Sequence, residues 1–153
     1  ISGRKDNLRS DILRPQVADL KTQCARWNER YHRLEAGVRG TPGLTVVERP
    51  PEETIVGSSI QILLLDWSEE KVRSVVSRCA ARGVELKWFG AAEPVAFTSR
   101  YDRWRYAETP KLPATARILA AIVDLRVPLT FTLDDCDVSA RIIRAEVGAT
   151  YQS

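Results

Sequence analysis

Residues 60–89, IQILLLDWSEEKVRSVVSRCAARGVELKWF, contain a strand, a helix and a second strand in direct succession. The apolar run at 60–65 is typical of a strand that is covered on both faces. Ser68, followed by two glutamates, predicts the N-cap of a helix. The apolar residues after it recur at helical spacing and are Val72, Val75, Val76, Cys79 and Ala80. Gly83 predicts the end of this helix, so residues 84–89 form the next strand.

The N-terminal side predicts a long amphipathic helix from residue 7 to about residue 38. Asp6 is placed to cap this helix. The apolar residues that follow, mostly at steps of three and four, are Leu8, Ile12, Leu13, Val17, Leu20, Cys24, Trp27, Tyr31 and Leu34. Pro15 lies within the pattern, so the helix is either kinked there or divided into two. Three glycines and a proline in residues 37–43 end it, and residues 44–47 form a short strand.

The C-terminal side predicts two more helices. Pro113 introduces a helix over residues 114–123, and residues 125–129 form a short extended piece. Thr132 with Asp135 three residues later resembles a capping box for the last helix. The apolar side of that helix consists of Val138, Ile142, Ile143 and Val147. The expected fold class is therefore α+β, a small sandwich of strands and helices carried on a long N-terminal helix.

The composition fits one globular domain in a reducing compartment. Hydrophobic residues make up 44% of the 153 residues, close to the average for globular proteins. The 23 basic and 20 acidic residues leave a net charge of +3, too weak by itself to indicate a nucleic-acid-binding protein. The three cysteines are far apart and form no C-x-x-C motif, which favours reduced thiols and a cytoplasmic location. The longest strongly apolar run, residues 62–65, is too short to span a membrane.

Metal and catalytic-triad chemistry are not indicated. His32 is the single histidine and has no neighbours at the spacing of metal ligands, so a structural or solvent-exposed role is expected. A Ser-His or Cys-His nucleophile would also need this histidine. No glycine-rich phosphate-binding loop is present in the sequence.

A dense group of arginines and aromatic residues, FTSRYDRWRY at 97–106, lies in a long irregular loop expected over residues 90–113. Such interleaving suits stacking on bases and contact with phosphates. It also suits a substrate that combines a diphosphate with a planar ring, such as a nucleotide-linked sugar. A loop that is anchored by its aromatic residues and has solvated arginines has the same composition. The residues alone leave these three interpretations open.

Lys87 lies between apolar neighbours in the strand predicted at 84–89. Burial lowers the pKa of a lysine, and a lysine with a lowered pKa is a candidate nucleophile or Schiff-base former. Strand alternation, however, places Lys87 on the face opposite Leu86 and Trp88. Glu85 and Phe89 share its face, and Glu85 could partly neutralise its charge. Reasoning from the residues therefore favours an ordinary strand residue.

Five segments, in order along the chain, match patterns of one enzyme family. Residues 2–17, SGRKDNLRSDILRPQV, align without a gap with N-x-R-M-S-E-L-Q-A-A-I-G-L-A-Q-L. Residues 26–31, RWNERY, 41–44, TPGL, and 79–84, CAARGV, are similar to R-R-x-x-A-x-x-Y, x-P-G-V and L-x-x-x-G-I. Residues 125–135, LRVPLTFTLDD, resemble the near-terminal signature L-P-L-Y-P-x-L-T-E-E. Together these segments resemble the DegT/DnrJ/StrS family of pyridoxal-phosphate-dependent aminotransferases, many of which act on nucleotide-linked keto sugars.

The resemblance implies a part of a longer cytoplasmic enzyme that works as a homodimer. Residues 1–40 would be the helix that links a large domain to a small one. Residues 41–153 would be the small C-terminal α+β domain, an antiparallel sheet covered by helices, as in fold-type-I pyridoxal-phosphate transferases. The N-terminal domain, with the Schiff-base lysine and the aspartate that pairs with the pyridinium nitrogen, would precede Ile1. The chain would then hold no catalytic residue and be inactive alone.

The resemblance also points to residues for the cofactor and the substrate. Ser2 and Arg4 would contact pyridoxal phosphate, with Ser2 in the place of a family asparagine. The residues expected to contact the substrate are Lys87, Trp88, Phe89 and Arg100. The family's His-Tyr pair after this strand is replaced around Trp88 and Phe89, which leaves the identity of the keto substrate open. The amino donor would usually be glutamate, and no metal site is expected.

Two other functions are compatible with the sequence. The first is a non-catalytic binding or dimerisation module that has the same fold. The second is an RNA-binding α+β domain that uses the loop at 100–106.

Overall fold

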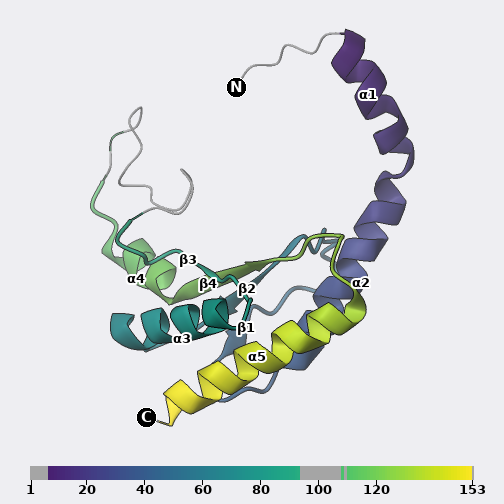
Figure 1. Ribbon diagram of the computed structural model, residues 1–153. Helices are drawn as coiled ribbons and strands as arrows, with labels where there is room; N and C mark the ends of the chain where they lie inside the picture. Colours follow the sequence, from purple (N-terminus) through teal and green to yellow (C-terminus); the bar gives the residue numbers. More distant parts are fainter. Residues whose placement is uncertain (1–6, 94–107, 109, 153) are drawn as a thin grey trace.

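The computed structural model describes residues 7–93, 108 and 110–152. In this part of the chain the helices are α1 (Asn7–Ala18), α2 (Leu20–Val38), α3 (Glu69–Ala81), α4 (Pro113–Ala121) and α5 (Leu133–Tyr151). The strands are β1 (Thr45–Val46), β2 (Ser59–Leu63), β3 (Lys87–Trp88) and β4 (Ile122–Arg126). Figure 1 shows the strands and helices gathered in one body, from which α1 projects. The predicted α+β fold class is confirmed.

The sheet has the strand order β1-β2-β4-β3, and every neighbouring pair is antiparallel. The central strands β2 and β4 place Ile60 opposite Leu125 and Ile62 opposite Val123. The outer strands β1 and β3 contain two residues each. Such short edge strands offer little unpaired backbone to other chains.

The central strand β4 begins earlier than the sequence predicts. The helix expected over residues 114–123 ends at Ala121, and the extended piece expected over 125–129 is the strand Ile122–Arg126. Burial alternates along this strand, with Val123 and Leu125 buried and Asp124 only half-buried. The alanines before β4 remain in helix α4, and the β-branched residues Ile122 and Val123 begin the strand that pairs with β2.

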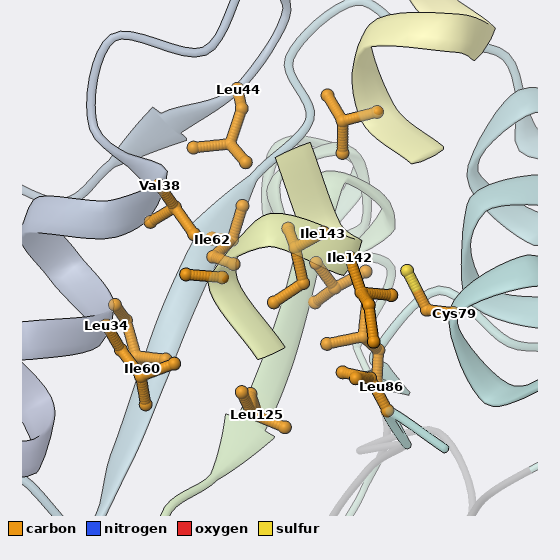
Figure 2. Packing of buried hydrophobic residues seen from close by; sticks show 14 of the residues in the cluster. Leu34, Val38, Leu44, Ile60, Ile62, Cys79, Leu86, Leu125, Ile142 and Ile143 are labelled. Atoms are coloured by element: carbon orange, nitrogen blue, oxygen red, sulfur yellow. The ribbon is translucent and has the colours of Figure 1, made fainter. Parts of the chain in front are cut away.

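One face of the sheet carries the hydrophobic core (Figure 2). Ile60 and Ile62 of β2 lie in one cluster with Leu34 of α2 and Ile143 of α5, and none of the four is more than 1% exposed. Helix α5 packs against both α2 and α3, so helices from the two ends of the chain close the core together. Complete burial of one such side chain contributes about 1.5–3 kcal/mol to folding.

The predicted helix ends are confirmed where side chains or a positive φ define them. Ser68 Oγ accepts a hydrogen bond from the Lys71 N–H at 3.3 Å, and Gly83 has a φ of +86° just after Arg82, the C-cap of α3. Thr132 and Asp135 form the predicted reciprocal capping box at the start of α5. These bonds satisfy backbone N–H groups that have no partner within their own helix.

The buried side of α5 differs from the prediction at one position. Ile143 and Val147 are buried as predicted, but Val138 is 43% exposed. Cys136 and Ala140 face the core instead, because they continue the three- and four-residue steps that lead to Ile143.

The N-terminal region forms two helices that meet at Asp19. The chain remains helical through Pro15, where the sequence predicts the kink or division. Aspartate is a poor residue for a helix interior, which is consistent with the break at Asp19. The apolar stripe reaches the core only in α2, where Leu34 is fully buried. On α1, Leu8 and Val17 remain 70% and 68% exposed.

Candidate functional site

Polar side chains from three neighbouring strands meet on the sheet face opposite the core, here called the outer face. The strand register places Gln61 of β2 and Lys87 of β3 on either side of Asp124 of β4. Their neighbours along each strand are buried, and successive side chains of a strand point to opposite faces. We refer to Gln61, Asp124 and Lys87 as the polar row.

The polar row combines a fixed carboxylate with an unpaired cation. Gln61 Nε2 donates hydrogen bonds to Asp124 Oδ1 at 2.6 Å and to Ser59 Oγ at 2.9 Å. Lys87 Nζ lies 4.9 Å from the centre of the Phe89 ring, in a cation–π contact. Among the described residues, Lys87 has no carboxylate within ion-pair distance. Its ammonium is therefore available to an anionic group of a ligand.

A hollow of about 270 Å³ adjoins the polar row. Asp124 lines it together with Ser59, and Trp27 of α2 and Arg126 at the end of β4 form other parts of its wall. The polar row and the hollow together offer hydrogen-bonding groups, the aromatic rings of Trp27 and Phe89, and two cations, Lys87 and Arg126. Groups of this kind suit a polar ligand that carries negative charge and hydroxyl groups.

The position of Lys87 is set by its buried neighbour. Trp88 is 7% exposed, and its Nε1 donates a 2.8 Å hydrogen bond to the Ala120 carbonyl oxygen in α4. Gly90 lies so close that a Cβ there would be 2.7 Å from Ala120 Cα. This contact between the end of β3 and α4 holds the strand, so Lys87 and Phe89 present their side chains on the outer face.

The structure describes three of the six residues predicted to bind cofactor or substrate. Lys87 and Phe89 are half-buried on the outer face, and Trp88 points into the core. Ser2, Arg4 and Arg100, like the whole segment 97–106, lie outside the described residues. The predicted alternation around Lys87 is confirmed, and the binding roles of all six residues remain predictions.

Sequence reasoning missed Asp124 and Gln61 as companions of Lys87. The signal for Asp124 was the alternation in IVDLR at 122–126, which the expected helix concealed. No local pattern marks Gln61, because only the pairing of β2 with β4 brings it to the row.

Several groups with shifted pKa values lie in or beside helix α5 or in the core. Arg33 donates two hydrogen bonds of 2.7 Å to Asp137, which join α2 to α5 and lower the pKa of Asp137. Hydrogen bonds from the backbone and side chain of Thr132 lower the pKa of Asp135. Burial raises the pKa of Cys79 to about 11, so this thiol stays protonated at neutral pH.

His32 is exposed and lies 3.3 Å, Nδ1 to Oε2, from Glu35. Within the described ranges no cluster of three or more histidine, cysteine or acidic side chains is arranged to hold a metal ion. None of the helices in those ranges has both the length and the apolar character needed to cross a bilayer.

Comparison with solved structures shows what this fold resembles. The chain superposes on an aminotransferase, TlmJ from Streptoalloteichus hindustanus, with a TM-score of 0.77 at 16% identity, covering 95% of this chain and 37% of TlmJ. It also resembles 3-amino-5-hydroxybenzoic acid synthase, with a TM-score of 0.68 at 22% identity, covering 90% of this chain and 38% of the synthase. A third neighbour is DesI, solved in the presence of its TDP-sugar product, with a TM-score of 0.66 at 14% identity, covering 89% of this chain and 34% of DesI.

These likenesses establish the fold. The chain spans little more than a third of the length of each of the three proteins. No protein-family model and no curated protein matches the sequence. The fold therefore resembles a portion of each of these three proteins.

Proposed function

We propose that this chain is the C-terminal domain of a pyridoxal-phosphate-dependent aminotransferase that acts on a nucleotide-linked keto sugar. The observation that carries this proposal is the superposition of 95% of the chain on one part of an aminotransferase. The sequence resemblance to the DegT/DnrJ/StrS family supports it independently. The proposal includes a cytoplasmic homodimer that takes its amino group from glutamate.

The exposed apolar residues of α1 support a position within a larger protein. Leu8, Ile12 and Val17 are each more than half exposed, although they continue the stripe that becomes core in α2. Exposed apolar surface of this kind marks contact with another protein surface. We assign residues 1–40 to the link with a large domain and residues 41–153 to the small domain.

The described residues do not fit a complete pyridoxal-phosphate site. The cofactor's aldehyde and its pyridine nitrogen lie at opposite ends of the ring, so the lysine and the aspartate that serve them must approach from opposite ends. Lys87 and Asp124 are instead side by side on adjacent strands, where Cβ atoms are about 5 Å apart. We therefore assign the Schiff-base lysine and most of the cofactor contacts to the rest of the enzyme.

The polar row then has a role in holding the substrate. The Lys87 ammonium would bind an anionic group, such as a phosphate of a nucleotide-linked sugar. Asp124 would accept hydrogen bonds from sugar hydroxyl groups, and Gln61 would donate hydrogen bonds to them. The hydrogen bond from Gln61 to Asp124 already fixes both side chains. Trp88 would act as a positioning residue through its bond to the Ala120 carbonyl.

Two experiments test this proposal. The first treats the 153-residue chain with pyridoxal phosphate and borohydride; we expect no trapped adduct on Lys87 by peptide mass spectrometry, and a stoichiometric adduct there would overturn the assignment. The second reads and expresses the whole gene. A lysine-bearing large domain before Ile1 and glutamate-dependent amination of a nucleotide-linked keto sugar are expected. A start codon directly before Ile1 would instead support a non-catalytic binding or dimerisation module.

A further inference from the structure

A second hollow, of about 350 Å³, lies at the meeting point of the chain before β1, the chain after β2, the first turn of α3 and the end of α5. We call it the terminal hollow. The residues of its wall that matter here are Gly43, Leu65, Asp66, Trp67, Lys71 and Tyr151. It shares no lining residue with the hollow beside the polar row. Its volume is near the lower limit for small-molecule sites, so it suits one small ligand.

One wall of the terminal hollow is a fixed aromatic surface. The rings of Trp67 and Tyr151 stack with their centres 6.2 Å apart and their planes at 23°. The backbone at Gly43 lies against both rings: an added Cβ would be 2.4 Å from Tyr151 Cδ2 and 2.9 Å from Trp67 Cζ2. Gly43 also has a φ of +78°, a conformation that favours glycine. Tyr151 is nevertheless 54% exposed, and Leu65 extends the apolar surface.

The same hollow holds one unpaired negative charge and one unpaired positive charge. Among the described residues, neither Asp66 nor Lys71 belongs to an ion pair. Glu69, which also lies in the first turn of α3, is paired with Arg73. Lys71 lies in the first turn of α3, where the helix dipole adds positive potential and favours a bound anion.

Asp66 has a left-handed backbone conformation, which glycine adopts more readily than aspartate. Its φ is +62°, and within the described residues it is the one non-glycine position with a positive φ. Glycine would adopt this conformation without strain, and strained residues cluster where function requires a particular side chain. Asp66 is exposed, and no ion pair in the described chain uses its carboxylate, so the carboxylate is open to a cationic group of a ligand.

We propose that the terminal hollow binds a free amino acid with an aromatic side chain. Asp66 receives the ligand's ammonium, Lys71 receives its carboxylate, and the side chain lies on the surface formed by Trp67, Tyr151 and Leu65. The opposite, unpaired charges select a zwitterion over a simple anion or cation, because a ligand with one charge leaves the other residue without a partner. This site is separate from the polar row and does not depend on the proposed aminotransferase function.

Titration calorimetry of the full 153-residue chain tests the proposal with three probes that share one ring. L-Phenylalanine carries both charges, phenethylamine only the ammonium and hydrocinnamate only the carboxylate. We expect L-phenylalanine to bind about tenfold or more tightly than either single-charge probe, as one charge-assisted hydrogen bond predicts. No heat of binding for L-phenylalanine at millimolar concentration, or equal affinity for hydrocinnamate, would overturn the proposal.

Single substitutions distinguish the contribution of each charged residue to ligand binding. Asp66→Asn keeps a residue that tolerates positive φ. This variant should weaken the binding of L-phenylalanine about tenfold and leave the affinity for hydrocinnamate unchanged. Lys71→Gln should weaken the binding of L-phenylalanine and leave the affinity for phenethylamine unchanged. Glu70→Gln, on the same helix but outside the wall of the hollow, is the matched control and should change nothing.

Asp66→Gly distinguishes a ligand-binding role from a structural one. Relief of the positive φ should raise the thermal unfolding midpoint while L-phenylalanine binding is lost. A lower midpoint for Asp66→Gly would show that the fold itself requires the aspartate and would count against the proposed site.

Discussion

Substitution of Gly37 by alanine tests the close approach of α2 to α5. A Cβ at Gly37 would lie 2.6 Å from Ala140 Cβ, whereas carbon atoms in good contact are about 3.5–4.0 Å apart. The two helices must therefore separate by about 1 Å, and overpacking of this kind costs about 1–3 kcal/mol. Alanine in place of glycine within a helix returns about 0.5–1 kcal/mol, so the variant should be destabilised overall.

Gly148→Ala is the matched control for this prediction. Gly148 lies within α5, and an added Cβ there meets nothing within 4 Å, so this variant should gain about 0.5–1 kcal/mol. Urea unfolding followed by circular dichroism measures both variants, and Gly37→Ala should be about 1–3 kcal/mol less stable than the control. In a double-mutant cycle, Ala140→Gly combined with Gly37→Ala should restore most of the stability that the overlap of the two Cβ atoms removes. If Gly37→Ala is as stable as Gly148→Ala, the inferred helix contact is wrong.

Three further outcomes are expected. Thr132→Ala should lower stability by about 1 kcal/mol in urea unfolding, because the start of α5 loses its cap. The folded state holds the pKa of Asp135 below its ordinary value of 3.8. The ionised carboxylate therefore contributes to the stability of the fold above that pH, and this contribution is lost as the pH falls through the folded pKa. The loss of stability caused by Thr132→Ala should accordingly become smaller in acid. A thiol reagent should modify half-buried Cys24 first, and buried Cys79 and Cys136 only on unfolding, as counted by absorbance.

The features that the sequence predicted well depend on residues close together in the chain. The cap at Ser68, the glycine end at Gly83 and the capping box at Thr132 were all readable, because each uses a bond or a φ angle within a few residues. Alternation around Lys87 was readable for the same reason.

The features that the sequence missed depend on distant partners. The alanine-rich stretch that ends at Ala121 favours a helix, and the pairing of residues 122–126 with β2 sets where the helix ends and the strand begins. Asp124 and Gln61 entered the candidate site through that same pairing. Likewise, the exposure of Leu8 and Val17 could not be read from their periodicity, because a regular apolar stripe does not reveal which part of it will find a partner.

The strand order has a consequence for how the chain folds during synthesis. β4 lies between β2 and β3 in the sheet, although it follows both along the chain. Until residues 122–126 leave the ribosome, β3 has no strand to pair with, and β2 lacks its neighbour β4 on one side. The helix that closes the core, α5, follows β4 along the chain. The core can close only after these long-range pairings, which are slow to form. Nascent chains that stop before β4 therefore expose Ile60 and Ile62, which are buried in the complete fold, and should depend on chaperones.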